Sequence, residues 1–430
     1  MSKVVLIADL RSRFGDDAVS QDTGPFAISG ASPAGVVAPS SVAQVSEVMA
    51  YAHERNLAVI AVGNATHLHV GSPPLRYDVA LSLRRLDRIV AHEAADMTVT
   101  VEAGCTLAPL DQTLARAQQW LPLDPPSPAR VTVGGLIAAN LNGPLRLSQG
   151  KVRDLLIGIT VVLADGSVAK GGGRVVKNVA GYDVGKLFTG SFGTLGVIVE
   201  ATFKIRPRPE RTRVVWIGAP DVKAAGKLAL GLLDANIAPL SVEVLNATAA
   251  ASAGRAGAGI VVGLGGIAAE LDAQESELRT RSGIALANCD GNDGTRLCAW
   301  LCDFPRATDA LLTARVSLLP TELVGLLPRM ESEAVARNLA VSAVVHAGNG
   351  VARLGLHGDS ETRALLFCEW LRIAVRERGG WVVFDSLPDT LHGRLDPFGN
   401  PTPAVLLMRA IKQQLDPRGI LSPGRFVGGI

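Results

Sequence analysis

Apolar and polar positions along the first two hundred residues predict an alternation of short helices and strands. Residues 41–56 begin with Ser41 and Gln44 in capping-box spacing, and apolar residues then recur every three or four positions, as in an amphipathic helix. The apolar run 57–62 and the alternating run 97–104 are typical of strands. The N-terminal half is therefore expected to mix helix and sheet.

Proline and glycine set the boundaries of the next elements. Thr106 is placed to cap a helix whose apolar face extends to Ala117, and the proline cluster 121–130 is incompatible with a helix or a central strand. A glycine pair opens a short apolar helix within 131–143. Residues 155–170 read as two strands joined by an Asp-Gly turn, which predicts a hairpin.

The pattern of apolar and polar positions changes at about residue 213, where strand-like runs begin to alternate with amphipathic helices. This pattern predicts an α+β segment with one antiparallel sheet and helices on one of its faces. A final helix and a tail rich in proline and glycine follow. The expected strands include 214–219, 259–266, 297–304 and 340–348, and the expected helices include 221–235, 268–280 and 319–338.

Composition and charge narrow the class of protein. A length of 430 residues favours two domains, and 48% hydrophobic residues suffice to build both cores. With 42 basic and 40 acidic residues interspersed, the chain lacks the basic surface of a nucleic-acid-binding protein. The five cysteines are odd in number and scattered, which argues against a disulfide framework and a metal site and fits a reducing cytosol.

Neither a signal peptide nor a membrane span is expected. The first apolar run has only five residues before Asp9, and no apolar stretch reaches the roughly 18 residues that a span needs. We therefore expect a cytoplasmic protein that reaches the inner face of the membrane only through partners.

Glycines gather at three places where the backbone can approach a ligand closely. They follow the strand 57–62 at Gly63, open a helix at Gly134 and Gly135, and punctuate the segment 190–196. The G-x-G-x-x-G fingerprint of a Rossmann site is absent, so an NAD site is not expected. The three elements suit an extended anionic cofactor such as FAD, and they also suit three unrelated turns. The residue pattern alone leaves both explanations open.

Several longer motifs resemble one family. The segment 171–209, preceded by VTVGGLIAAN and GKVRDLLIGITVVLADG, resembles the FAD-binding domain of the p-cresol methylhydroxylase and vanillyl-alcohol oxidase superfamily. Within it, KNVAGYD and GSFGTLGVI resemble the FAD-binding subunits of glycolate oxidases. The tail 407–426 is similar to the DPxGIxNPGR ending of that family. The resemblance is strong over about 35–210 and good over 404–426.

The resemblance implies an α+β fold with a two-subdomain FAD-binding domain of vanillyl-alcohol-oxidase type. An α/β cap of ferredoxin-like type is implied between the two parts of that domain. The expected boundaries are 1–212 for the FAD-binding domain, 213–385 for the cap and 386–430 for the segment that returns to the first domain.

The same resemblance implies which residues contact FAD. Asn64 and Ala65 depart from the family's richer glycine and serine content. Some relatives tether the flavin through a histidine of this loop, but Thr66 occupies the tethering position here, with His67 and His69 beside it, so we expect non-covalent FAD. The implied cofactor-binding residues are Val62, Gly63, Asn64, Ala65, Thr66, His67, Pro126, Thr132, Val133, Gly134, Gly135, Ala138, Asn140, Gly143, Gly193, Gly196, Val197 and Ile198.

The catalytic residues are not identified by the sequence. Related 2-hydroxyacid dehydrogenases carry a metal-and-substrate motif HxGDGNxH in the cap, where this chain reads HAGNGVARL. Asn349 replaces the aspartate, Arg353 replaces the second histidine, and the later EHGIG motif has no counterpart. His346 remains as a candidate base for the hydroxyl proton, and a structural histidine at a strand end is the better explanation.

These features imply an FAD-dependent oxidoreductase that acts on 2-hydroxy acids as the FAD-binding subunit of a multi-subunit glycolate oxidase. The resemblance implies two partners, a catalytic flavin subunit and an iron–sulfur subunit. The cysteines of this chain lack the spacing of cluster ligands, so electrons are expected to leave through another chain. Two alternatives stay open. One is a self-sufficient glycolate or D-lactate dehydrogenase, and the other is a structural subunit that has lost the flavin.

Overall fold

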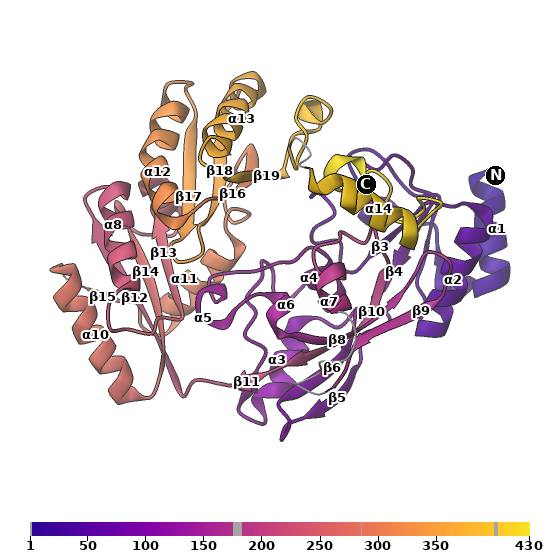
Figure 1. Cartoon of the computed structure of the whole chain (residues 1–430), viewed down its shortest axis with the longest axis horizontal. Coiled ribbons are helices and arrows are strands. Elements are labelled where there is room, and N and C mark those ends of the chain that lie inside the picture. The colour runs from indigo at the N-terminus through magenta and orange to yellow at the C-terminus, as the bar shows by residue number, and fades with distance from the viewer. Residues whose placement is uncertain (1, 175–182, 285, 400–402) are drawn as a thin grey trace. The chain divides into compact units, whose positions relative to one another are not determined.

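The structure, a computed structural model, describes residues 2–174, 183–284, 286–399 and 403–430 (Figure 1). Most of the KNVAGYD motif therefore lies outside the described residues. The chain forms two compact units. The first contains residues 1–141, 151–208 and 400–430, and the second contains 142–150 and 209–399.

This division differs from the expected boundaries at three places. The second unit begins at Pro209, because the strand that pairs with its sheet already starts at Arg211. Residues 386–399 belong to the second unit as well, since Leu391 and Leu395 are buried in its core. The short segment 142–150 interrupts the first unit and packs Leu147 against the second core.

In the first unit, a small sheet carries the strand that leads into the glycine loop. The apolar residues from which this strand was predicted are largely buried. In the sheet, β4 pairs in parallel with both β3 and β2. The predicted helix at 41–56 is confirmed as α2, whose N-cap Ser41 accepts a hydrogen bond from the N–H of Gln44. The elements are α1 (Lys3–Phe14), β1 (Val19–Ser20), β2 (Gly35–Val37), α2 (Val42–Arg55), β3 (Val59–Val62) and β4 (Val79–Ser82), with sheet order β1-β2-β4-β3.

A second, antiparallel sheet of five strands completes this unit. It contains the predicted hairpin, whose strands β8 and β9 pair from Gly158–Gly172 to Val162–Val168. The helix after Thr106 ends at Ala115, so Ala117 lies beyond it and is exposed, contrary to expectation. Thr106 occupies the N-cap position without a side-chain hydrogen bond to the helix. The sheet has the order β5 (Ile89–Glu93), β6 (Thr98–Glu102), β10 (Val197–Lys204), β8 (Leu156–Val162) and β9 (Val168–Gly172).

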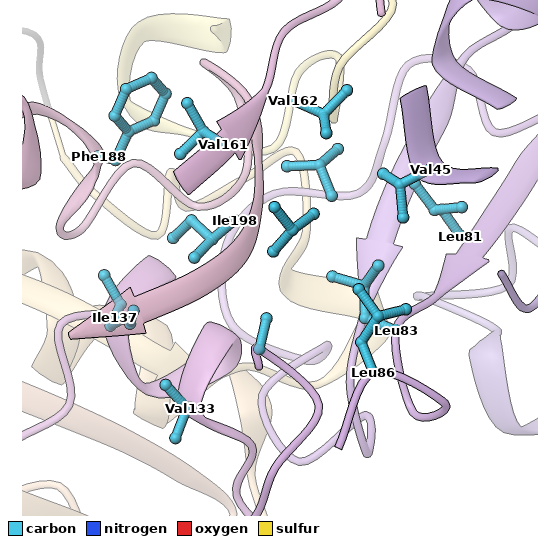
Figure 2. Packing of buried hydrophobic residues seen from close by; sticks show 14 of the residues in the cluster. Val45, Leu81, Leu83, Leu86, Val133, Ile137, Val161, Val162, Phe188 and Ile198 are labelled. Carbon is cyan, nitrogen blue, oxygen red and sulfur yellow. The ribbon is translucent and has the colours of Figure 1, made fainter. Parts of the chain in front are cut away.

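One hydrophobic core joins the two sheets of the first unit. Figure 2 shows Val45 and Leu81, from α2 and β4, on one side of this core, and Val161 and Ile198, from β8 and β10, on the other. The remaining elements of the unit are α3 (Leu107–Ala115), β7 (Gln119–Trp120), α4 (Val133–Ala138), α6 (Val152–Leu155), α7 (Val184–Phe188), β11 (Arg206–Pro207) and α14 (Ala404–Leu415).

The second unit is built on one antiparallel sheet of eight strands, as its alternating pattern predicts (Figure 1). The segment 297–304, expected to be a strand, lies instead in the helix α11 (Asn292–Asp303), where Leu297 and Leu301 are four residues apart on one buried face. The strands run in the order β15 (Ala287–Asn288), β12 (Arg211–Ala219), β14 (Ala258–Gly266), β13 (Ser241–Leu245), β17 (Ala340–His346), β18 (Val351–His357), β16 (Leu312–Ser317) and β19 (Trp381–Ser386).

Helices cover both faces of this sheet, whereas the sequence predicted only one covered face. Val215 and Ile217 of β12 pack into the larger core with α8, α10, α12 and α13. Trp216, between them in the strand, points to the other face and packs with α9 and α11. The helices are α5 (Arg146–Gln149), α8 (Val222–Leu233), α9 (Ala247–Ser252), α10 (Ala268–Ser282), α11, α12 (Pro320–Val335) and α13 (Glu361–Arg376).

Candidate cofactor-binding site

A pocket in the first unit gathers the three glycine-containing elements that the sequence singled out. The loop after β3, the start of α4 and the segment that leads into β10 all line it, together with Arg425 of the C-terminal tail. The predicted residues that line it are Val62, Gly63, Asn64, Ala65, Thr66, His67, Thr132, Gly134, Gly135, Ala138, Gly193, Gly196 and Ile198.

The loop after β3 lies directly against the start of α4. A Cβ atom on Gly63 would overlap the side chain of Thr132, so only glycine fits at this position. Thr132 is the N-cap of α4, and its Oγ1 accepts a hydrogen bond from the N–H of Gly135 at 3.3 Å. The two elements therefore form one continuous wall of backbone.

The two departures from the family's loop composition both have a structural explanation. Nδ2 of Asn64 donates to the carbonyl of Arg130 at 2.8 Å, which ties the loop to the segment before α4. Ala65 has φ +57°, the left-handed conformation that glycine would adopt at lower cost. The loop thus keeps a glycine-like backbone although its side chains differ.

The adjacent glycines of α4 have different roles. Gly134 faces the core, because an added Cβ would lie 2.9 Å from the Cβ of Ala103, and its N–H donates to the carbonyl of Ala103 at 2.7 Å. Gly135 faces the pocket, where an added Cβ would meet only Oγ1 of Thr132 at 3.2 Å. Gly135 therefore leaves room for a ligand to approach the backbone.

The third side of the pocket is the segment that leads into β10, and hydrogen bonds to the end of α4 hold it in place. The N–H groups of Gly190 and Phe192 donate to the carbonyls of Ile137 and Ala138, each at 2.9 Å. Gly193 has φ +70°, a conformation that favours glycine. Gly196 is close to the ring of Phe188, 2.9 Å from an added Cβ, so it serves packing as well as lining the pocket.

Eight pocket residues were not predicted: Ile60, Ala61, Leu68, Leu83, Ala103, Ala139, Phe192 and Arg425. Arg425 is 4% exposed, and its guanidinium donates to the carbonyls of Leu68, Val70 and Ser72 at 2.7, 2.7 and 2.9 Å. Burial lowers the pKa of Arg425 to about 10. In the sequence, Arg425 belongs to the Pro-Gly-Arg of the tail, which carries part of the family resemblance. That motif does not indicate which side chain lies in the pocket.

The other predicted cofactor residues do not line this pocket. Val133 and Val197 are fully buried in the core, and Pro126 is buried in the first unit. Asn140 lies next to Gly190, with its Cβ 3.4 Å from the position of an added Cβ there. Gly143 belongs to the second unit.

The candidate base His346 lies at the end of β17 in the second unit, 4% exposed. Its Nδ1 is 2.6 Å from Oε2 of Glu243, its partner in the register of β13 and β17. Burial raises the pKa of Glu243, and the charge of His346 opposes that shift. Arg353, at the position of the second motif histidine, is buried, has its pKa lowered by burial, and donates to the carbonyl of Cys302 at 3.0 Å.

These residues form a buried polar cluster without the composition of a metal site. Within the described parts of the chain, no group of three or more His, Cys, Asp or Glu side chains is arranged to hold a metal ion. In the same parts of the chain, no helix has the length and apolar character needed to cross a bilayer.

Comparison with family models finds an FAD binding domain over residues 33–172 and the C-terminal domain of FAD linked oxidases over residues 400–426. The first match contains the loop after β3 and the start of α4, and the second contains Arg425. These matches confirm the expected FAD-binding domain and cofactor class.

Several curated proteins are similar in sequence. The glycolate oxidase subunit GlcD of Bacillus subtilis is 31% identical over 214 residues, which cover 50% of this chain and 46% of that protein. The mitochondrial D-lactate dehydrogenase [cytochrome] of Arabidopsis thaliana is 25% identical over 424 residues, covering 91% and 73%. The mitochondrial D-2-hydroxyglutarate dehydrogenase of Rattus norvegicus is 26% identical over 410 residues, covering 90% and 76%. The chain thus spans about half the length of GlcD and about three quarters of the other two.

Solved structures of low sequence identity share the fold. p-Cresol methylhydroxylase with substrate bound is similar with a TM-score of 0.80 at 17% identity, covering 98% of this chain and 96% of that one. Alkyldihydroxyacetonephosphate synthase is similar with a TM-score of 0.74 at 16% identity, covering 98% and 86%. The predicted mixed fold of p-cresol methylhydroxylase type is confirmed.

Proposed function

We propose that the chain is the FAD-binding subunit of a multi-subunit glycolate oxidase, because an FAD binding domain and the C-terminal domain of FAD linked oxidases match it, a glycolate oxidase subunit is similar in sequence, and its fold is similar to that of p-cresol methylhydroxylase. FAD, when bound, supplies the acceptor for the hydride that leaves a 2-hydroxy acid. The residues of this chain hold and orient the cofactor.

One observation carries the proposal: three backbone walls and a buried cation meet at one pocket. Gly135 leaves an open approach to the backbone, Gly63 lets the loop after β3 lie against α4, and Arg425 brings a positive charge to a lining without Asp, Glu or Lys. Backbone N–H groups and a guanidinium are the donors that suit phosphate oxygens. The pocket therefore fits an extended anionic ligand such as FAD.

The cap supports a division of labour between subunits. Oxidation of a 2-hydroxy acid requires a base for the hydroxyl proton. His346 is buried against Glu243, and Arg353 donates to a backbone carbonyl of α11, so both side chains have structural partners. We infer that a partner subunit supplies the catalytic base.

The same reasoning assigns the partners. A catalytic flavin subunit would complete the reaction, and an iron–sulfur subunit would carry the electrons away, because the scattered cysteines of this chain do not suit a cluster. In this proposal the protein works in the cytoplasm, held at the inner face of the membrane by its partners.

A self-sufficient D-lactate or glycolate dehydrogenase is the second candidate. It is favoured by the sequence similarity to D-lactate dehydrogenase [cytochrome], which extends over 91% of this chain and includes the cap. A subunit without flavin is disfavoured, because Asn64 and Ala65 preserve the path of the loop rather than filling the pocket.

The purified chain tests the proposal. It should be yellow, with a flavin spectrum, and heat or acid should release FAD into the supernatant, because Thr66 occupies the position of a tethering histidine. A colourless protein that also fails to take up added FAD would contradict the proposal. Flavin that stays with the denatured chain would contradict only the non-covalent attachment. Affinity purification from cells that produce the whole complex should yield the catalytic and iron–sulfur subunits with it.

A further inference from the structure

We propose that Arg425 binds the diphosphate of FAD and is the main charged determinant of the cofactor's affinity. This inference rests on the proposed function, since it requires that the pocket takes FAD. It goes beyond it by assigning the neutralisation of the phosphate charge to one side chain of the C-terminal tail.

The first observation is that a cation is buried without an anion. Arg425 is 4% exposed, and no carboxylate of the described residues forms an ion pair with it. A buried guanidinium remains charged at neutral pH, and leaving such a charge without an opposite charge is costly. The anionic partner is therefore expected from outside the chain, at the surface that Arg425 shares with the pocket.

The second observation concerns the hydrogen bonds that Arg425 makes. A guanidinium has five N–H donors, and three of them are used by the carbonyls of Leu68, Val70 and Ser72. These bonds use both hydrogens of one terminal nitrogen and one hydrogen of the other. The remaining N–H groups, one on Nε and one on the other terminal nitrogen, are left for a ligand, and because they point in different directions each can donate to a separate oxygen.

The third observation is the location of the charge within the pocket. Leu68, whose carbonyl accepts from Arg425, follows directly on the loop 63–67 that lines the pocket. The guanidinium thus lies beside the loop 63–67. Backbone carbonyls, rather than a flexible side chain, fix it there. A charge held in place before the ligand binds does not have to be ordered on binding.

The same three bonds also support a different explanation, in which Arg425 only fastens the tail to the loop. The two explanations predict different effects of charge. We therefore compare Arg425→Gln, which removes the charge, with Arg425→Lys, which keeps the charge but cannot make the three-carbonyl fork. Arg418→Gln is the matched control, because Arg418 lies in the same tail, also donates to backbone carbonyls, those of His53 and Glu54, and is exposed.

The experiment measures FAD binding to the apo-protein by fluorescence titration at several NaCl concentrations, with thermal unfolding of the apo-proteins in parallel. Arg425→Gln should weaken FAD binding about 10- to 100-fold and flatten its salt dependence. Arg425→Lys should stay within about tenfold of the parent and keep the parent's salt dependence, even if its melting temperature falls. Arg418→Gln should bind FAD as the parent does.

Riboflavin, which has no phosphate, provides a second probe. Its affinity should be the same for the parent and Arg425→Gln. Equal losses for FAD and riboflavin, or FAD binding by Arg425→Gln that matches the parent, would overturn the proposal. If Arg425→Gln does not fold, Arg425→Lys decides, because loss of FAD binding with the charge retained would leave only the fastening role. A parent that binds no FAD would instead contradict the proposed function itself.

Discussion

Nδ1 of His346 lies 2.6 Å from Oε2 of Glu243 on the neighbouring strand, and both side chains are buried. A histidine in such a contact is held in one orientation by its neighbour. The pair sits on the face of the sheet that α9 and α11 cover, since Leu245 and Val344 pack there and each lies two residues along the strand from Glu243 or His346, on the same face. It is a buried polar pair of the cap core.

This pair should make the stability of the second unit depend on pH. Burial raises the pKa of Glu243. The folded state then binds a proton more tightly than the unfolded state, so the contribution to stability is present below the ordinary pKa of a glutamate and is lost as the pH rises through the raised value. Glu243→Gln cannot ionise, so its unfolding free energy should exceed that of the parent increasingly as the pH rises above the ordinary pKa of a glutamate.

Urea unfolding followed by tryptophan fluorescence measures this effect, because four of the five tryptophans, Trp216, Trp300, Trp370 and Trp381, lie in the second unit. Glu275→Gln in the same unit is the control, because the pKa of Glu275 is shifted in the opposite direction to that of Glu243. Burial raises the pKa of Glu275, but hydrogen bonds from Arg279 and Asn288 and the charge of Arg213 outweigh it and lower the value. The two variants should therefore diverge from the parent in opposite directions with pH; parallel profiles would contradict the assignment.

Gly135→Asp should abolish or strongly weaken FAD binding while leaving the fold intact. Gly135 is the glycine of α4 that faces the pocket, so the new carboxylate would lie close to the expected phosphates. Repulsion between like charges at a few ångströms in a partly desolvated site is about 1–4 kcal/mol, or one to three decades of affinity. Fluorescence titration with FAD measures the loss.

Three controls separate this effect from misfolding. Gly135→Ala adds only a Cβ at 3.2 Å from Thr132 and should bind FAD far better than the aspartate variant. Gly134→Ala should instead destabilise the first unit, because its Cβ would press on Ala103. Ala117→Asp, placed on an exposed residue beyond α3, should change neither stability nor binding. FAD binding by Gly135→Asp that equals that of Gly135→Ala would show that the cofactor does not approach this helix.

The local elements of the first unit were predictable because their signals are local. The capping pair Ser41 and Gln44 and the turn in the hairpin β8–β9 act within a few residues, so the pattern is sufficient. The segment 297–304 was mistaken for a strand because its short apolar run fits both periodicities, and only packing of Leu297 and Leu301 distinguishes a helix. The sequence predicted helices on only one face of the cap sheet, because the residue pattern of a strand does not indicate which elements will cover its second face.

The candidate site divides in the same way. Gly63, Gly134 and Gly135 were found because glycine is needed wherever backbones approach closely. Arg425 was missed because its place in the pocket depends on contacts with residues 68–72, more than three hundred and fifty positions earlier in the chain. Such a contact leaves no local pattern.

Lys412→Met should loosen the C-terminal tail. Nζ of Lys412 donates to Asp416 at 2.6 Å and to the carbonyls of Thr194 and Leu421, each at 2.8 Å. Burial lowers the pKa of Lys412, and the charge of Asp416 opposes that shift. Removing the cation leaves the buried carboxylate of Asp416 with only the backbone N–H groups of Ile420 and Leu421 as donors, and breaking a buried ion pair in this way typically costs about 3–5 kcal/mol.

Thermal unfolding followed by circular dichroism measures this cost, and FAD titration measures its consequence at the pocket. We expect weaker FAD binding, because Thr194 is the neighbour of the pocket residue Gly193. Gln413→Met, on the exposed next position of α14, is the matched control and should unfold as the parent does. An unchanged melting temperature for Lys412→Met would show that the buried pair does not hold the tail.

The isolated chain should bind FAD but should not oxidise glycolate at a useful rate. The motif HAGNGVARL keeps Gly348 and Gly350, which shape the turn between β17 and β18, but has Asn349 and Arg353 in place of the aspartate and second histidine of related dehydrogenases. Loss of one general base typically lowers a rate about 10²- to 10⁴-fold, and residues that act as a unit are not replaced by the survivor.

His346→Ala should therefore leave the near-zero glycolate turnover of the isolated chain unchanged and act only on stability, because its partner Glu243 would remain buried without the histidine. Gly135→Asp, in contrast, should lower the activity of the assembled complex by removing a flavin. The measurement is reduction of an artificial electron acceptor by glycolate, with the isolated chain and with the complex. If the isolated chain turns over glycolate and His346→Ala abolishes that activity, the chain is itself the catalyst, and the contact with Glu243 orients its base.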